Sequence, residues 1–376
     1  MRQAPVVNMG TIVLYDILGR EHPGCDRQTQ LAKAMQWLCR AQDANADGGV
    51  SEGYHLFHGW LPSYPETTGY IIETFFDHYH ATGDESLRDR ALRMADWLIS
   101  IQSSDGSITD SQFRHKLVFD TGQVVFGLVR AYRESGLEEY SAAAARAGTW
   151  LVEAQDDDGA WRRHALDDIP HSYYSRVAWS LLQLHSITRS QQLVDAAVKN
   201  VRWVLAQQRD TGWFDSAGFT TAMNPAPFTH TIAYTIRGVL ECGIYLNEAR
   251  FVSAAVKAMD NLLEHVPEDG RVGGTYDASW RGDTSFSCLT GNAQLAIILH
   301  RLFQHTGRRR YLTGATKIGT YLATKQELRA SSPDLHGAIA GSDPIWGRYI
   351  HFCYPNWAAK FFADSLLIAG ATQAKA

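Results

Sequence analysis

Apolar residues recur along the chain with the spacing of amphipathic helices, and the helical segments come in two kinds. In segments such as "LRDRALRMADWLISIQ" and "QLVDAAVKNVRWVLAQQ", apolar positions repeat at i, i+3, i+4 and i+7, while the other face is charged or rich in alanine. Each is followed by a segment that is apolar on nearly every face, such as "TGQVVFGLVRAY" or "HTIAYTIRGVLECGIYL". The first kind predicts helices with one face in water, and the second predicts buried helices.

A glutamine and a glycine mark the end of each amphipathic segment. Gln102, Gln155 and Gln208 each precede a glycine by four residues, Gln42 begins a looser copy, and Gln326 an echo without the glycine. In one further copy, "EHVPEDGRV", valine stands where glutamine would be. These anchors recur every 53 to 60 residues, which indicates a repeat architecture.

The stretch "AQDDDGAW", residues 154–161, is one of these repeated helix ends. We expect its glycine to adopt the left-handed conformation that closes a helix, with Trp161 folded back as a packing lid. A calcium loop would need more oxygen ligands at alternating positions. The stretch therefore predicts a structural turn.

Six outer–inner helix pairs predict an all-α fold, an (α/α)6 toroid. The repeats span about residues 28–370, so we predict a single domain over residues 1–376. Connections from inner to outer helices are short, whereas those from outer to inner helices are long, and long loops in a compact domain are usually functional. We expect the long ones to gather over the N-termini of the inner helices, where free N–H groups suit anionic or hydroxyl-rich ligands. These connections are residues 43–67, 103–120, 156–173, 209–229, 267–289 and 327–355.

Composition narrows the partners and the compartment. The net charge is −5 without a basic stripe, which argues against a nucleic-acid partner. The five cysteines are scattered and form no CxxC pair, as expected for a reducing compartment. Since there is neither a leader pattern nor a run of 18 apolar residues, we predict no membrane span and a cytoplasmic protein, periplasmic if a leader precedes the sequence.

Polar and aromatic side chains stand at the start of every predicted inner helix. Glu66 and Asp120 open the first two, His171 the third, and His230 and Tyr234 the fourth. Carboxylates, histidine and tyrosine are the usual proton donors and acceptors, so we predict these five as catalytic residues. Each has a structural alternative: Asp120 as a helix cap, Glu66 as a partner of the helix dipole, and each histidine as a satisfied core residue.

A second group of residues is predicted to bind the ligand. Arg176 and Arg237 lie on apolar helices, where a buried guanidinium needs a partner, and Glu66 or Asp120 could be that partner. Aromatic residues on the loops are typical stacking platforms for sugars, and could equally close the fold. The other predicted binding residues are Trp60, Tyr64, Gln123, Tyr173, Asn292, Trp346, Arg348, Tyr354 and Asn356.

The repeated turns and helix pairs resemble the α/α-toroid superfamily, which includes squalene cyclases, prenyltransferase β-subunits and six-hairpin carbohydrate enzymes. The segments "YPETTGYI", "LTGNAQLAI" and "YPNWAAKFFADSL" look like uncharacterised toroid proteins of bacterial exopolysaccharide gene clusters. This resemblance implies a carbohydrate substrate and other polysaccharide-pathway proteins as partners. The chain has no DxDD acid motif, which disfavours terpenoid cyclisation.

We predict neither a cofactor nor a metal site. The zinc ligands of prenyltransferases have no clear match, although a zinc site built from Cys288, Cys353 and His351 remains an alternative.

Three functions remain open. The first is glycoside hydrolysis by Asp120 as proton donor and Glu66 as base or orienting group, since "VFDTGQVV" resembles the aspartate-bearing helix start of unsaturated-glucuronyl hydrolases. The second is a uronate lyase or sugar epimerase that uses the His, Tyr and Arg set, since sugar 2-epimerases of this fold resemble it in having two inner-helix histidines. The third is a non-catalytic glycan-binding protein of polysaccharide assembly.

Overall fold

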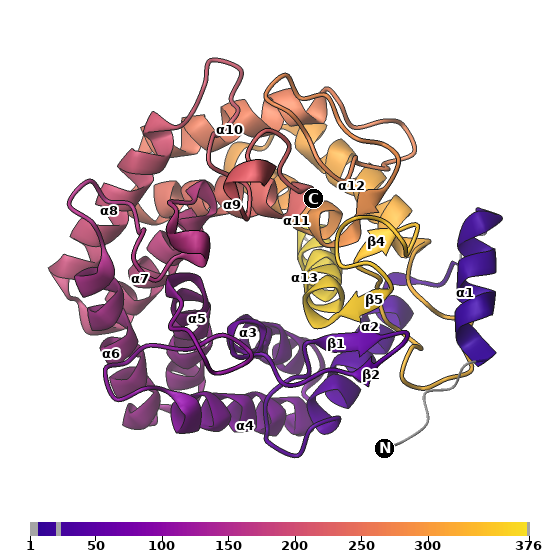
Figure 1. The fold of residues 1–376 in the computed structure, drawn as a ribbon, viewed down its shortest axis with the longest axis horizontal. Coiled ribbons are helices and arrows are strands. Elements are labelled where there is room, and N and C mark those ends of the chain that lie inside the picture. The colour runs from indigo at the N-terminus through magenta and orange to yellow at the C-terminus, as the bar shows by residue number, and fades with distance from the viewer. Residues whose placement is uncertain (1–6, 20–23, 374–376) are drawn as a thin grey trace.

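The computed structural model describes residues 7–19 and 24–373, and twelve of its helices form two concentric rings (Figure 1). The inner ring consists of α3 (Pro65–Thr82), α5 (Val118–Ser135), α7 (Ser175–Thr188), α9 (Thr229–Leu246), α11 (Leu289–Thr306) and α13 (Asn356–Gln373). The outer ring consists of α2 (Arg27–Asp43), α4 (Glu85–Ile101), α6 (Glu138–Ala154), α8 (Gln191–Ala206), α10 (Ala249–Leu263) and α12 (Arg309–Ala323). The predicted all-α (α/α)6 toroid is confirmed.

The hydrophobic core lies between the two rings. Inner helices are buried along most of their length, whereas outer helices bury only the face that carries their periodic apolar residues. The last inner helix, α13, packs against α2 and α3, so the first and last helix pairs meet and the ring is closed. None of the described helices is both long and apolar enough to cross a membrane.

The long connections gather on one end of the barrel, as predicted, and contain short strands and 3-10 turns. Strands β2 (Gly59–Trp60), β1 (Gly53–His55) and β5 (Cys353–Pro355) form one antiparallel sheet, and β3 (Ser287–Cys288) pairs with β4 (Ser342–Asp343). The 3-10 turns are η1 (Leu166–Asp168), η2 (Ser172–Tyr174) and η3 (Thr221–Met223). An additional helix, α1 (Val7–Ile17), lies outside the rings, where Asp16 accepts a hydrogen bond from the backbone N–H of Ile345 at 2.7 Å.

Wherever the repeated glutamine is present, it bonds the end of one outer helix to the next outer helix. The side-chain amide of Gln155 donates to the carbonyl of Gly159 in its own turn at 3.1 Å and to that of Ala196 on α8 at 2.9 Å. One bond fixes the turn and the other fixes the neighbouring repeat. The same two kinds of bond are made by Gln42, Gln102, Gln208 and Gln326.

The copy at Gln326 closes the ring. Its amide donates to Gly337, eleven residues on, and to Gln30 on α2, so the last turn is bonded to the first outer helix. The glycine of this copy is thus present but displaced, which is why the sequence spacing does not reveal it.

The prediction that the glycine closes the helix is wrong in detail. Helix α6 ends in an extended residue, Gln155, and Gly159 follows in the turn with a φ of 92°. A Cβ on Gly159 would lie 2.4 Å from the carbonyl oxygen of Lys199, so the glycine permits close contact with α8. Left-handed C-cap glycines instead end inner helices, as at Gly83 and Gly136.

The turn itself is structural, as predicted. Asp156 and Asp158 both form ion pairs with Arg162 at 2.8 Å. Trp161 is buried and donates its indole N–H to the carbonyl of Leu151 at 2.9 Å, which holds it against α6.

Replacing Gly159 with alanine is expected to destabilise the protein by about 1–3 kcal/mol, because the new Cβ combines a strained φ with a clash. The matched control is Gly319→Ala in α12, where a Cβ meets nothing within 4 Å and better helix propensity is expected to add up to about 1 kcal/mol. Urea denaturation of both variants measures the difference, and equal stabilities would contradict the proposed role of the turn.

Candidate functional site

Glu66 and Asp120 lie in the first turns of two adjacent inner helices, α3 and α5. The N-cap residues of these helices are Tyr64 and Leu117, and neither of them makes a side-chain cap bond. The alternative that Asp120 serves as a helix cap is therefore wrong. The two helices pack closely at Gly69, where a Cβ would lie 2.7 Å from the backbone of α5.

The two carboxyl groups interact electrostatically. Asp120 is 2% exposed and its Oδ2 has no hydrogen-bond partner. Burial, together with the negative charges of Glu66 and Asp110, raises the pKa of Asp120 well above its usual value. The environment of Asp120 therefore favours the protonated form.

Glu66 is in a different state. Burial raises the pKa of Glu66 to about 7, although the Tyr64 hydroxyl and the Arg176 guanidinium act in the opposite direction. Both carboxyl groups thus keep their protons to a higher pH than usual, and Glu66 titrates near pH 7. Two carboxyl groups with different pKa values are the usual arrangement for an acid and a base.

Aromatic residues surround the pair. Phe119 contacts Tyr173 at a distance of 5.2 Å between ring centroids. Burial raises the pKa of the Tyr173 hydroxyl, and the charges of Glu66 and Asp120 raise it further. Tyr64 and Glu66 are only half-buried, so the pair retains a water-accessible side.

His230 is held neutral on α9. Burial and the charge of Arg176 lower its pKa to about 3. The amide of Gln294 lies 2.6 Å from Nδ1 and donates to it, which leaves the ring proton on Nε2. The ring also packs against Tyr234 at 4.3 Å, so these two predicted residues are adjacent.

His171 is instead engaged with the backbone. Its Nδ1 lies 3.0 Å from the carbonyl of Gly218 and its Nε2 lies 2.9 Å from the carbonyl of Leu166. Burial lowers the pKa of His171, so the ring has one N–H, which donates to one of these carbonyls and holds the ring between two loops. These contacts do not support the predicted catalytic role of His171.

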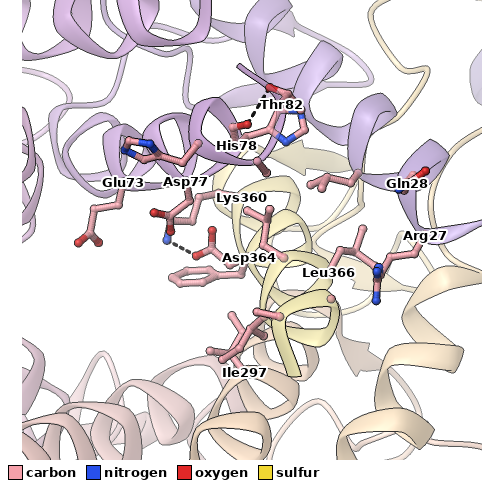
Figure 2. Close-up of a pocket in the computed structure, with 18 of the residues that line it drawn as sticks. Arg27, Gln28, Glu73, Asp77, His78, Thr82, Ile297, Lys360, Asp364 and Leu366 are labelled. Carbon is pink, nitrogen blue, oxygen red and sulfur yellow. Dashed lines mark hydrogen bonds and ion pairs between the residues drawn. The ribbon is translucent and has the colours of Figure 1, made fainter. Parts of the chain in front are cut away.

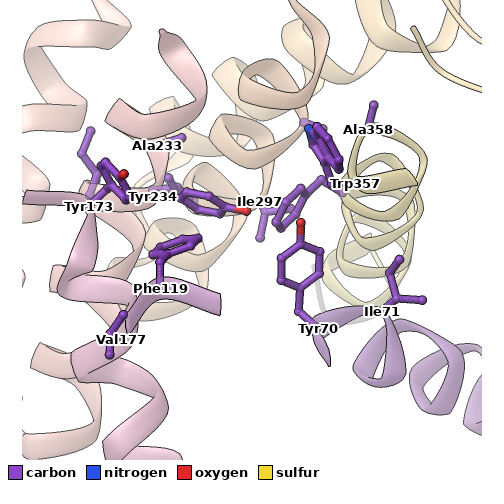
Figure 3. Packing of buried hydrophobic residues seen from close by; sticks show 14 of the residues in the cluster. Tyr70, Ile71, Phe119, Tyr173, Val177, Ala233, Tyr234, Ile297, Trp357 and Ala358 are labelled. Atoms are coloured by element: carbon purple, nitrogen blue, oxygen red, sulfur yellow. The ribbon is translucent and has the colours of Figure 1, made fainter. Parts of the chain in front are cut away.

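Arg176 lies within a cluster of aromatic rings from five inner helices, which we call the aromatic septum. Figure 3 shows Tyr70 and Tyr234 of this cluster among their neighbours. The guanidinium is 3% exposed, and its Nε donates to Gln123 at 2.6 Å. Its central carbon lies 4.8–5.7 Å from five ring centroids, those of Tyr70, Phe126, Trp179, Tyr234 and Phe361. Through Arg176 the septum lies between Glu66, whose pKa this charge lowers, and the large cavity described next.

The large cavity opens at the other end of the barrel, below the septum (Figure 2). Its volume is about 910 Å³, and it is bounded by the C-terminal ends of α3 and α13 and the start of α2. The charged side chains that line it include Glu73, Arg176, Arg237, Lys360 and Asp364. The expectation that the pocket opens under the long loops is wrong for this cavity, because aromatic side chains fill the middle of the barrel.

Several predicted binding residues have other contacts. Arg237 lies below the septum and donates to Glu241 at 2.8 Å. Asn356 donates to Ser51 and Thr67, and so joins the starts of α13 and α3. Asn292 donates to Ser287 beside it at 3.0 Å.

The predicted aromatic and loop residues are dispersed. Trp60 packs against Trp37 and donates to Asp334 on the outer side of the ring. Tyr354 is buried in β5. On the loop surface, Trp346 is 40% exposed and Arg348 pairs with Asp283. These residues do not adjoin the acid pair through any contact described for them.

The zinc alternative finds no support in the described residues, where no three His, Cys, Asp or Glu side chains are grouped to hold a metal ion. Burial raises the pKa of the Cys288 and Cys353 thiols to about 12, so both stay protonated.

Sequence reasoning missed Tyr70, Glu73 and Tyr349. Tyr70 and Glu73 follow Glu66 by four and seven residues, so helical spacing along α3 would have placed all three on one face. Tyr349 packs against His230 at 5.3 Å and accepts a hydrogen bond from Trp357, but it comes from an irregular loop that carries no such signal.

With this geometry in view, the chain can be compared with known proteins. The model of the squalene-hopene cyclase C-terminal domain matches residues 61–240. No curated protein matches the sequence. The fold is that of the α/α toroids.

Three solved structures illustrate the likeness. An unsaturated glucuronyl hydrolase specific for heparin is 16% identical, with a TM-score of 0.75 over 93% of this chain and 98% of its own. The unsaturated glucuronyl hydrolase from Bacillus sp. GL1 is 16% identical, with a TM-score of 0.73 over 91% of this chain and 96% of its own. Cellobiose 2-epimerase from Bacillus thermoamylovorans is 12% identical, with a TM-score of 0.70 over 95% of this chain and 99% of its own. At these identities the likeness shows the fold alone.

Proposed function

We propose that this protein is a carbohydrate-active enzyme that hydrolyses a glycosidic bond in a uronate-containing oligo- or polysaccharide. The observation that carries the proposal is the pair of Asp120 and Glu66. Asp120, whose raised pKa favours the protonated form and whose Oδ2 has no partner, can donate a proton to the leaving oxygen, and Glu66 can take a proton from water. Unsaturated glucuronyl hydrolases share the fold, which supports an acidic sugar as substrate.

Epimerisation is the second candidate, because His230 is a neutral histidine beside Tyr234. A two-histidine mechanism would need His171 as well, and both nitrogens of that ring contact backbone carbonyls. The carboxylate pair therefore remains the better-supported centre.

The likeness to squalene-hopene cyclases does not lead us to propose terpenoid cyclisation. Aromatic rings stabilise cations by their negative faces, and a cyclase would use them for a carbocation. Here Arg176 already places a permanent cation among these rings. The space that a carbocation would need is thus filled by a side chain.

The test is a panel of uronate-rich polysaccharides and unsaturated uronyl oligosaccharides, with neutral polysaccharides as controls. New reducing ends without new ultraviolet absorbance would support hydrolysis. New absorbance would instead show an elimination, and solvent deuterium in an uncleaved sugar would show epimerisation. Either of these, or no reaction with any member, would contradict the proposal.

The pH profile of kcat/KM is expected to rise through about pH 7, because Glu66 must lose its proton to act as a base. At higher pH the rate is expected to fall as Asp120 loses the proton that it donates. Glu66→Gln should remove the rising limb together with most of the activity. A profile that stays flat around pH 7 would contradict the role of Glu66.

A further inference from the structure

The cavity below the aromatic septum takes no part in the carboxylate chemistry proposed above. Its walls include the apolar side chains of Leu31, Ala32, Ile297 and Leu366 beside polar ones at the helix ends, such as Arg27 and His78. Its volume of about 910 Å³ lies within the range of small-molecule sites in proteins. A cavity of this size with both apolar and charged lining would suit a molecule with two chemically different ends.

Two arginines supply unused hydrogen-bond donors at the inner end. Their guanidinium groups lie 5.4 Å (Arg176) and 5.1 Å (Arg237) from the ring of Trp179. Among the described residues, each donates only through Nε, to Gln123 and to Glu241 respectively. The terminal nitrogens of both arginines therefore remain available to a ligand in the cavity that they line.

The other charges of the cavity are largely matched within the protein. Lys360 pairs with Asp364 at 2.5 Å, and Asp77 pairs with Arg130 at 2.8 Å. Glu73 extends into the cavity (Figure 2); burial raises the pKa of its carboxyl group, while the charges of Lys360 and Arg176 act in the opposite direction. The two arginines thus keep terminal N–H donors that no hydrogen bond of the described residues uses.

We propose that this cavity is a second binding site, for an amphipathic anion. A carboxylate or phosphate head group binds the terminal nitrogens of Arg176 and Arg237, and an apolar chain lies along Leu31, Ile297 and Leu366. Guanidinium groups bind such oxyanions through paired, charge-assisted hydrogen bonds. Burial of the chain adds a contribution that grows with its apolar area. The proposal does not rest on the glycosidase activity.

Isothermal titration calorimetry of the full chain with decanoate and with decyl phosphate tests the proposal. We expect saturable one-to-one binding of at least one of them, and the tighter of the two identifies the head group. Decanol, acetate and inorganic phosphate are the controls for head and tail. The absence of binding by both amphiphiles, or equal binding of decanol, would overturn the proposal.

Arg237 and Arg301 provide a matched pair of variants, because both donate to Glu241 but only Arg237 lines this cavity. Arg237→Gln is expected to weaken binding of the anion about tenfold or more, the usual effect of losing a charged hydrogen bond. Arg301→Gln is expected to change the affinity for the anion by less than about twofold, because it also removes a hydrogen bond to Glu241 but lies outside the cavity. Equal losses of affinity in the two variants would show that the ligand does not bind Arg237.

A second variant keeps the test independent of charge and of the stability of the Glu241 pairs. Ala32 is half-buried in α2 and lines the apolar end of the cavity. Ala32→Phe should fill this end and weaken binding of decanoate, while acetate remains undetected. Unchanged affinity for decanoate in this variant would place the chain elsewhere and overturn the proposed site.

Discussion

Replacing Asp120 with asparagine is expected to lower the turnover of the susceptible glycan by about 10²–10⁴-fold, the usual contribution of a general acid. Asparagine keeps the size of the side chain but cannot donate a proton to a leaving oxygen. Binding of the substrate should change little, so the loss should appear in kcat rather than in KM. Reducing-end assays of the purified variant measure it, with Asp89→Asn, at a 70% exposed side chain on α4, as the silent control.

The same variant distinguishes a catalyst from a structural partner, and this measurement needs no substrate. The folded-state pKa of Asp120 lies well above its unfolded value, so the folded protein holds a proton that the unfolded chain has lost. Stability is therefore lost as the pH rises from the unfolded pKa toward the folded one. Asp120→Asn removes this cost, and its Tm at neutral pH should exceed that of the wild type. A lower Tm would instead mean that the carboxyl group supports the fold.

A gain in stability with a loss of activity is the pattern expected of a functional site. A buried carboxyl oxygen without a partner is costly, and a chain under selection for stability alone would pair or replace it. Arg176 lies close enough to lower the pKa of Glu66 but forms no ion pair with either carboxylate. The contacts therefore do not support the alternative that Glu66 and Asp120 serve only as partners of Arg176 and Arg237.

The fold followed from the sequence because its information is local and repeated. Apolar periodicity separates outer from inner helices, and the turn at Gln155 recurs once in each repeat with few exceptions. What the periodicity could not give is the bond from each glutamine to the next outer helix, such as that to Ala196, because it depends on how repeats stack. For the same reason the displaced glycine of the last copy, Gly337, was not found.

The candidate site was predictable only in part. Glu66, Asp120 and His230 could be placed because each starts an inner helix, and helix starts share one end of the barrel. The end at which the large cavity opens could not be predicted, because it depends on how the side chains of Arg176 and Tyr234 fill the space between several helices. Likewise, the loop geometry that engages both nitrogens of His171 leaves no trace in its sequence.

Replacing Glu241 with glutamine is expected to destabilise the protein by about 3–5 kcal/mol, the usual cost of removing one partner from a buried ion pair. Its side chain is 7% exposed and accepts from Arg237 at 2.8 Å and from Arg301 at 2.9 and 2.8 Å. Burial alone would raise the pKa of Glu241, but the two arginines outweigh it and lower the pKa. A neutral amide would leave both guanidinium groups without a counter-charge.

Urea denaturation at neutral pH measures this cost, and Glu268→Gln is the matched control. The ion pair of Glu268 with Lys317 has the same length, 2.8 Å, but the glutamate side chain is 93% exposed. Water screens such a pair, so its loss should change the stability by less than about 1 kcal/mol. If the two variants lost equal stability, burial would not be what gives the Glu241 cluster its strength. Because Glu241 also orients Arg237 at the inner cavity, its glutamine variant should bind decanoate or decyl phosphate more weakly even where it remains folded.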